Sequence, residues 1–106
     1  MSMDMNKMLQ QVQQMQEQMV KAQEELKHET VEASAGGGTV TVKVSGALEV
    51  LEVRIAPEAI DPEDPETLGD MVVAATNEAL RSAQSLMEAK LGPAMGGLSG
   101  LGLPGF

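Results

Sequence analysis

The spacing of apolar residues changes twice along this chain of 106 residues, and that change limits the elements it can form. In the first third, apolar side chains recur at steps of three and four. They are Met5, Met8, Val12, Met15, Met19, Ala22 and Leu26. This is a heptad pattern, which aligns the side chains along one narrow seam of an α-helix. It predicts a helical rod of about 30 to 40 Å that needs a partner surface, because a rod cannot bury its own seam.

From about Glu29 the apolar residues alternate with polar ones instead. The alternating positions are Val31, Ala33, Val40, Val42, Val44, Leu51, Val53 and Ile55. Alternation predicts three antiparallel strands, of which the middle one is half buried, with one sheet face packed on helices. Gly36 to Gly38 and Ser45 to Ala47 mark the two reversals, where we expect glycine to supply the positive φ of a tight turn.

A second helix is predicted after an acidic, proline-rich turn. Asp64 is the expected N-cap and Pro65 the first helical residue, while Gly92 followed by Pro93 is expected to end the helix. The fold class is therefore α+β: a long N-terminal helix, a three-stranded meander and a second long helix. We expect a dimerising domain over residues 1–92 and a flexible Gly/Leu/Pro-rich tail over residues 93–106.

Composition excludes several classes of function. The chain has no cysteine and a single histidine, His28, so no nucleophile and base are supported and we expect neither an enzyme nor a small-molecule substrate. No cofactor is predicted, because the glycine patch leads into a strand rather than the helix of a phosphate loop. The acidic turn is explained by helix capping rather than metal binding. No apolar run suits a membrane span or secretory signal, so we expect a cytoplasmic protein.

The region from Gly36 to Gln84 resembles the YbaB/EbfC family of bacterial nucleoid-associated proteins. The likeness lies in the glycine patch, the valine hairpin from Thr39 to Gly46, the strand up to Ile55 and the second-helix stretch around Asn77-Glu78-Ala79-Leu80. It extends over roughly residues 5 to 98. It implies an intertwined homodimer with helices projecting like tweezers. It also implies a protein of the nucleoid that binds duplex DNA and influences nucleoid organisation and gene expression.

If the chain binds DNA, the expected contacts are basic side chains on both helices. They are Lys7, Lys21, Lys27, Arg81 and Lys90. Against a formal net charge of −9, so few contacts predict modest, salt-sensitive binding to phosphates with little sequence selectivity. On the first helix, Lys7, Gln14, Lys21 and His28 are seven residues apart and share one stripe, which suits either phosphate contact or a merely solvated face.

The sheet and second helix carry more apolar surface than a monomer of this size can bury, so we expect a dimer interface there. Its predicted residues are Val40, Val42, Val44, Leu51, Val53, Ile55, Val72, Ala75 and Ala79. Two alternatives to DNA binding stay open. The methionine seam suits an acidic adaptor or chaperone-like dimer that holds a protein partner, and the third interpretation is a structural dimer without a ligand.

Overall fold

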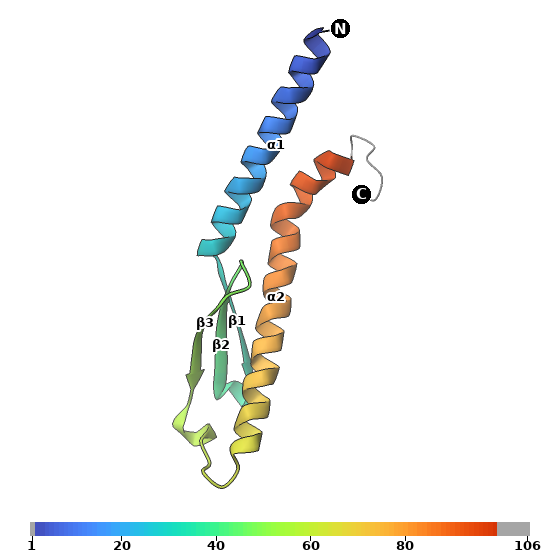
Figure 1. Ribbon diagram of the computed structural model, residues 1–106. Coiled ribbons are helices and arrows are strands. Elements are labelled where there is room, and N and C mark those ends of the chain that lie inside the picture. Colours follow the sequence, from blue (N-terminus) through green and yellow to red (C-terminus); the bar gives the residue numbers. More distant parts are fainter. Residues whose placement is uncertain (1, 100–106) are drawn as a thin grey trace.

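A computed structural model describes residues 2–99 of the chain and confirms the α+β class. Helix α1 (Ser2–His28) is followed by strands β1 (Thr30–Ala35), β2 (Val40–Ser45) and β3 (Val50–Ile55), and then by helix α2 (Pro65–Ser99). The strands form one antiparallel sheet in the order β1-β2-β3, as a meander should. The molecule is elongated, measuring 74 × 25 × 16 Å, because α1 continues far past the sheet (Figure 1).

Helix α2 covers one face of the sheet and makes the core with it. Val40, Val42 and Val44 of β2 are fully buried, and they pack against Ala75, Ala79 and Ala83, which repeat every four residues along α2. Alanine at the contact lets the helix backbone approach the sheet closely, while the β-branched valines fill the space between them. The alternation in β2 therefore predicted its buried face correctly.

Strand β3 continues the apolar face, but α2 packs on β1 and β2 instead. Val53 and Ile55 pair with the buried Val42 and Val40, yet they remain 43% and 37% exposed. The register shifts between Lys43 and Val44, where Val50 rather than Leu51 pairs with Val44. The protomer thus leaves one apolar strip of its sheet without a cover.

The two turns of the sheet place their positive φ angles on different kinds of residue. Gly36, Gly37 and Gly38 all have positive φ, as predicted. In the second turn the prediction was wrong, because the residue with positive φ is Leu48 (φ 66°) and not Gly46. Gly46 is needed for close packing: a Cβ there would lie 2.7 Å from the carbonyl oxygen of Leu26 at the end of α1.

We therefore expect Gly46→Ala to destabilise the fold by about 1–3 kcal/mol, because the added methyl group must push the end of α1 off the turn. Gly69→Ala is the matched control, since a Cβ at Gly69 meets nothing within 4 Å. That change should raise stability by up to about 1 kcal/mol through helix propensity. Urea denaturation followed by circular dichroism measures both. A Gly46→Ala protein as stable as the parent would show that the contact with Leu26 relaxes without cost.

The start of α2 agrees with the prediction and its end does not. The carboxylate of Asp64 accepts hydrogen bonds from the Thr67 backbone N–H (3.3 Å) and the Thr67 hydroxyl (2.6 Å), so Asp64 is the N-cap. Helical backbone then continues through Gly92 and Pro93 to Ser99. Proline removes one backbone hydrogen bond without forbidding helix, and α2 bends in its last turns (Figure 1). Residues 100–106 of the predicted tail lie outside the described residues.

Candidate nucleic-acid interface

Among the described residues, helix α1 forms an arm whose buried and half-buried seam residues lie in its C-terminal half. Met15, Met19 and Ala22 are half-buried and Leu26 is 2% exposed, whereas Met5 and Met8 are 69% and 63% exposed. The same heptad seam therefore serves two purposes. Its last turns dock the helix on the domain, and its first turns stand in solvent beyond the sheet (Figure 1).

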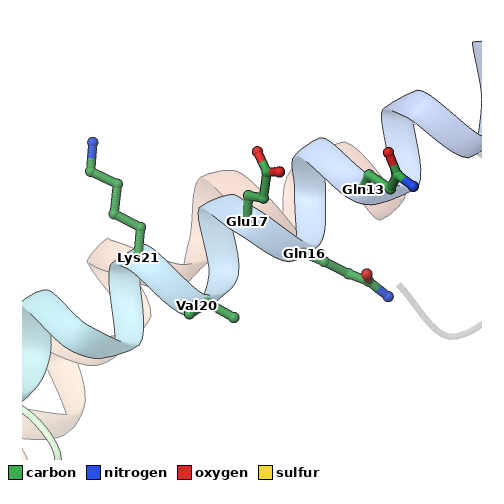
Figure 2. A pocket seen from close by; sticks show the side chains of 5 residues that line it. All are labelled: Gln13, Gln16, Glu17, Val20 and Lys21. Atoms are coloured by element: carbon green, nitrogen blue, oxygen red, sulfur yellow. The ribbon is translucent and has the colours of Figure 1, made fainter.

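Two of the predicted DNA contacts, Lys7 and Lys21, lie exposed on this arm. Neither forms an ion pair within residues 2–99. Lys21 projects from the same side of α1 as Glu17, one turn earlier, but extends away from it, while Val20 points to the other side (Figure 2). A hollow of about 390 Å³ here is lined by Gln13, Gln16, Glu17, Val20 and Lys21. All its described lining comes from one convex helix, so we assign no small-molecule site to it.

Lys27 and Arg81 form ion pairs with neighbours on their own helices. The Nζ of Lys27 lies 3.2 Å from Oε1 of Glu24, and an Nη of Arg81 lies 2.8 Å from Oε2 of Glu78. Both pairs are more than half exposed, and exposed pairs of this kind contribute only about 0–1 kcal/mol. A phosphate oxygen can therefore replace either carboxylate at little cost.

Lys90 occupies a different environment from the other four predicted contacts. Its Nζ lies 2.8 Å from Oε2 of Glu25 and 2.9 Å from Oε1 of Glu29, at the junction of α1 and β1. The hydrogen bond and charge of Lys90 hold the pKa of Glu25 below its ordinary value. The two carboxylates raise the pKa of Lys90. The pairs thus persist through neutral pH, weaken as acid protonates Glu25, and weaken in base as Lys90 deprotonates. Sequence reasoning missed them because their partners lie far apart along the chain.

The structure divides the residues predicted at the dimer interface into two groups. Five of them are fully buried within the protomer and so cannot present surface to a second chain: Val40, Val42, Val44, Ala75 and Ala79. Within this chain α2 covers them, which the strand pattern alone did not specify. Leu51, Val53 and Ile55 remain exposed and Val72 is half-buried. Val50, Ile60 and Val73 are also exposed, and the prediction did not include them.

Acidic charge gathers at the end of the molecule away from the arm. Residues 57–70 carry six carboxylates and no basic side chain. These are Glu58, Asp61, Glu63, Asp64, Glu66 and Asp70. They lie on η2 (Pro57–Ala59), on the following turn and at the start of α2, below the sheet in Figure 1. Residues 2–23 of the arm instead balance Asp4 and Glu17 against Lys7 and Lys21. The net charge of −9 therefore does not describe the surface of the arm.

The other two basic residues, Lys43 and Arg54, lie on the face of the sheet opposite α2. Both approach Glu32, at 3.9 Å and 3.1 Å, and Arg54 also lies 3.7 Å from Glu52. Within the described residues, no group of three or more His, Asp or Glu side chains is placed to hold a metal ion. No described helix has an apolar stretch long enough to cross a membrane.

Comparison with known proteins finds the same likeness along almost the whole chain. The YbaB/EbfC DNA-binding family matches residues 1–98. A nucleoid-associated protein of Alkaliphilus metalliredigens is 50% identical over 103 residues, which cover 97% of this chain and 88% of the relative. A nucleoid-associated protein of Saccharopolyspora erythraea is 49% identical over 109 residues, covering 97% and 94%.

A solved structure shares the fold at lower sequence identity. The crystal structure of an uncharacterized protein from Helicobacter pylori is 22% identical and superposes with a TM-score of 0.63. The match covers 70% of this chain and 77% of that one. At this identity the likeness supports the α+β fold and nothing finer.

Proposed function

The chain belongs to the YbaB/EbfC DNA-binding family, which is not a family of enzymes, and we propose that it binds duplex DNA in the nucleoid as a homodimer. In this proposal the α1 arms of the two protomers contact the phosphate backbone. Binding has little sequence selectivity, because the described basic side chains are few and suited to phosphates rather than to a set of base edges.

The observation that carries the proposal is the separation of charge along the molecule. A duplex repels a uniformly acidic surface, but here the carboxylates of residues 57–70 lie at the far end from the arm. Lys7 and Lys21 lie on a stretch of helix without net charge, two heptads or about four helical turns apart, and both are exposed. Lys27 and Arg81 can join them by releasing weak local partners.

Homodimerisation is supported by the uncovered apolar strip of the sheet. Val50, Val53 and Ile55 lie beside the core valines of β2 but have no helix above them. A small domain that leaves such a strip open gains stability when a second copy covers it. A dimer also doubles the number of lysines that can reach one duplex, which compensates for the small number on each chain.

An electrophoretic mobility shift with long duplex DNA over a salt series tests the proposal, using protein whose dimeric state is verified by light scattering. We expect the logarithm of the binding constant to fall linearly with the logarithm of the salt concentration, with a slope of about −4 to −7. That range corresponds to roughly four to eight phosphate contacts per dimer at 0.9 each. A folded dimer that causes no shift at low salt, or whose binding ignores salt, would contradict the proposal.

The exposed tip of the arm favours a second candidate, a dimer that holds a protein partner. Met5, Met8 and Val12 form an open apolar seam, and the neighbouring positions are mostly glutamine, so charge does not oppose the approach of a partner helix. Reversing the charges of Lys7, Lys21 and Arg81 separates the candidates. DNA binding should be lost, whereas a partner bound through the seam should be retained.

A further inference from the structure

The joint between α1 and the domain lies at Glu29, where helix gives way to strand. Three contacts hold it. The side chain of Leu26 is buried, the Gly46 N–H donates to the Glu29 carbonyl oxygen (2.9 Å), and Lys90 of α2 reaches both Glu25 and Glu29. The first two fix the position at which α1 meets the sheet. Among residues 2–99, the ion pairs with Lys90 are the contacts between charged side chains that tie the joint to α2.

Apolar packing at the joint is incomplete. A hollow of about 250 Å³ lies between the end of α1, the β2–β3 turn and α2. Its lining includes Leu26, Ala47, Met87 and Leu91. If these apolar side chains filled the hollow, they would fix the angle between α1 and α2. A helix next to such a hollow has room to pivot, because dense side-chain packing is needed to fix the angle between two helices. The apolar contacts at the joint therefore leave room for the angle of the arm to vary, and the polar contacts help to set it.

The carboxylate of Glu29 would also favour opening of the joint if Lys90 were replaced. One carboxylate oxygen, Oε1, pairs with Lys90, and the other, Oε2, is buried without a hydrogen-bond partner among the described residues. A carboxylate in this position is stabilised chiefly by its counter-charge. The Lys90 and Glu29 side chains are 29% and 36% exposed, so the pair is only partly shielded from water. Removing Lys90 leaves the Glu29 carboxylate without its counter-charge, which favours a rearrangement that lets water reach Oε2.

We propose that Lys90 is a positioning residue: with Glu25 and Glu29 it forms a latch that fixes the angle at which the α1 arm leaves the domain. The latch controls where Lys7 and Lys21 stand, since a small rotation at the joint is amplified along the arm. Gln10 lies 15 residues before Glu25, or about 22 Å along the helix, so a rotation of roughly 15° displaces it by about 6 Å. Its effect on DNA binding rests on the proposed function, but its effect on arm geometry does not.

The distance between the arm and α2 tests the latch directly. The chain has no cysteine, so Gln10→Cys on α1 and Gln84→Cys on α2, both exposed positions, accept spin labels without competing sites. Diluting labelled protein into excess unlabelled protein restricts the measurement to one protomer. We expect a narrow distance distribution in the parent protein, and a distribution that broadens or shifts by about 5 Å or more in Lys90→Gln.

Two further variants make the result decisive. Glu25→Gln with Glu29→Gln breaks the same latch but keeps the Lys90 charge, and should broaden the distribution as Lys90→Gln does. Lys90→Arg, which keeps charge and reach, should restore the narrow one. Circular dichroism verifies that each variant is folded. Identical distributions in the parent protein, Lys90→Gln and the double glutamate variant would overturn the proposal.

DNA binding then distinguishes a positioning residue from a direct contact. If Lys90 touched phosphate, Lys90→Gln would weaken binding and the double glutamate variant, by releasing Lys90, would strengthen it. A latch predicts that both weaken binding. Glu58→Gln with Glu63→Gln is the matched control, because it removes the same two negative charges from exposed positions before the start of α2, far from Lys90 near its end. If no variant binds DNA, including the parent protein, the proposed function fails while the distance measurement still decides the latch.

Discussion

Replacing Lys7 and Lys21 together with glutamine should lower affinity for duplex DNA by about a thousandfold near 0.1 M salt. The estimate follows from four lost phosphate contacts per dimer, each releasing about 0.9 counterion. The salt slope should become shallower by about 3 to 4 for the same reason. Both lysines are exposed and lie outside the core, so the fold should not change. Fluorescence anisotropy with a labelled duplex over a salt series measures both quantities.

Lys43→Gln with Arg54→Gln is the matched control for that double variant. It removes the same two positive charges, but from the sheet face where both side chains pair with Glu32. These partly exposed pairs contribute little to stability, so the control should fold and keep its affinity within a few-fold. Equal losses in the two double variants would show that overall charge, and not the arm, governs binding.

Val53→Glu should convert the proposed dimer into a folded monomer and raise its dissociation constant by more than about a hundredfold. Val53 is 43% exposed in the protomer, so the isolated chain tolerates a glutamate there. In a dimer closed over β3, the same carboxylate would be buried without a partner, at a cost of several kcal/mol by analogy with other buried charges. Sedimentation velocity over a concentration series reports the change.

Val20→Glu supplies the comparison for that variant. Val20 is an exposed valine of α1, away from the uncovered strip of the sheet, and its replacement should leave the dimer intact. The monomeric Val53→Glu protein should also show about half the salt slope of the dimer, because it presents half the lysines. A Val53→Glu protein that stays dimeric would place the interface elsewhere, and the exposed seam of α1 would be the next surface to substitute.

The local features of this fold could be predicted because they depend on neighbours in the sequence. The heptad seam, the alternation in β2 and the Asp64 cap each involve residues within a turn or a strand of one another, and the structure has all three. The end of α2 was mispredicted because Gly92 and Pro93 weaken helix without excluding it.

The residues of the candidate site also differ in whether their surroundings depend on neighbours in the sequence or on distant segments. The exposure of Lys7 and Lys21 follows from their place on α1 opposite the seam, so the sequence was enough to locate them. Lys90 was predicted as a phosphate contact because the sequence shows only that it is a lysine on a helix. It does not show which side chains of other elements lie next to it. Its partners Glu25 and Glu29 approach only after α2 has folded back along α1.

The sequence by itself therefore determined the elements, their order, the buried face of β2 and the basic stripe of the arm, since periodicity and capping act over a few residues. The tertiary structure alone decided which apolar residues remain for a partner. Helix α2 lies over β1 and β2, which hides Val40, Val42 and Val44 and leaves Val53 and Ile55 open. The same packing decided the need for glycine at Gly46 and the ion pairs of Lys90 with Glu25 and Glu29, because burial and ion pairing depend on segments that are distant in sequence and adjacent only in the folded chain.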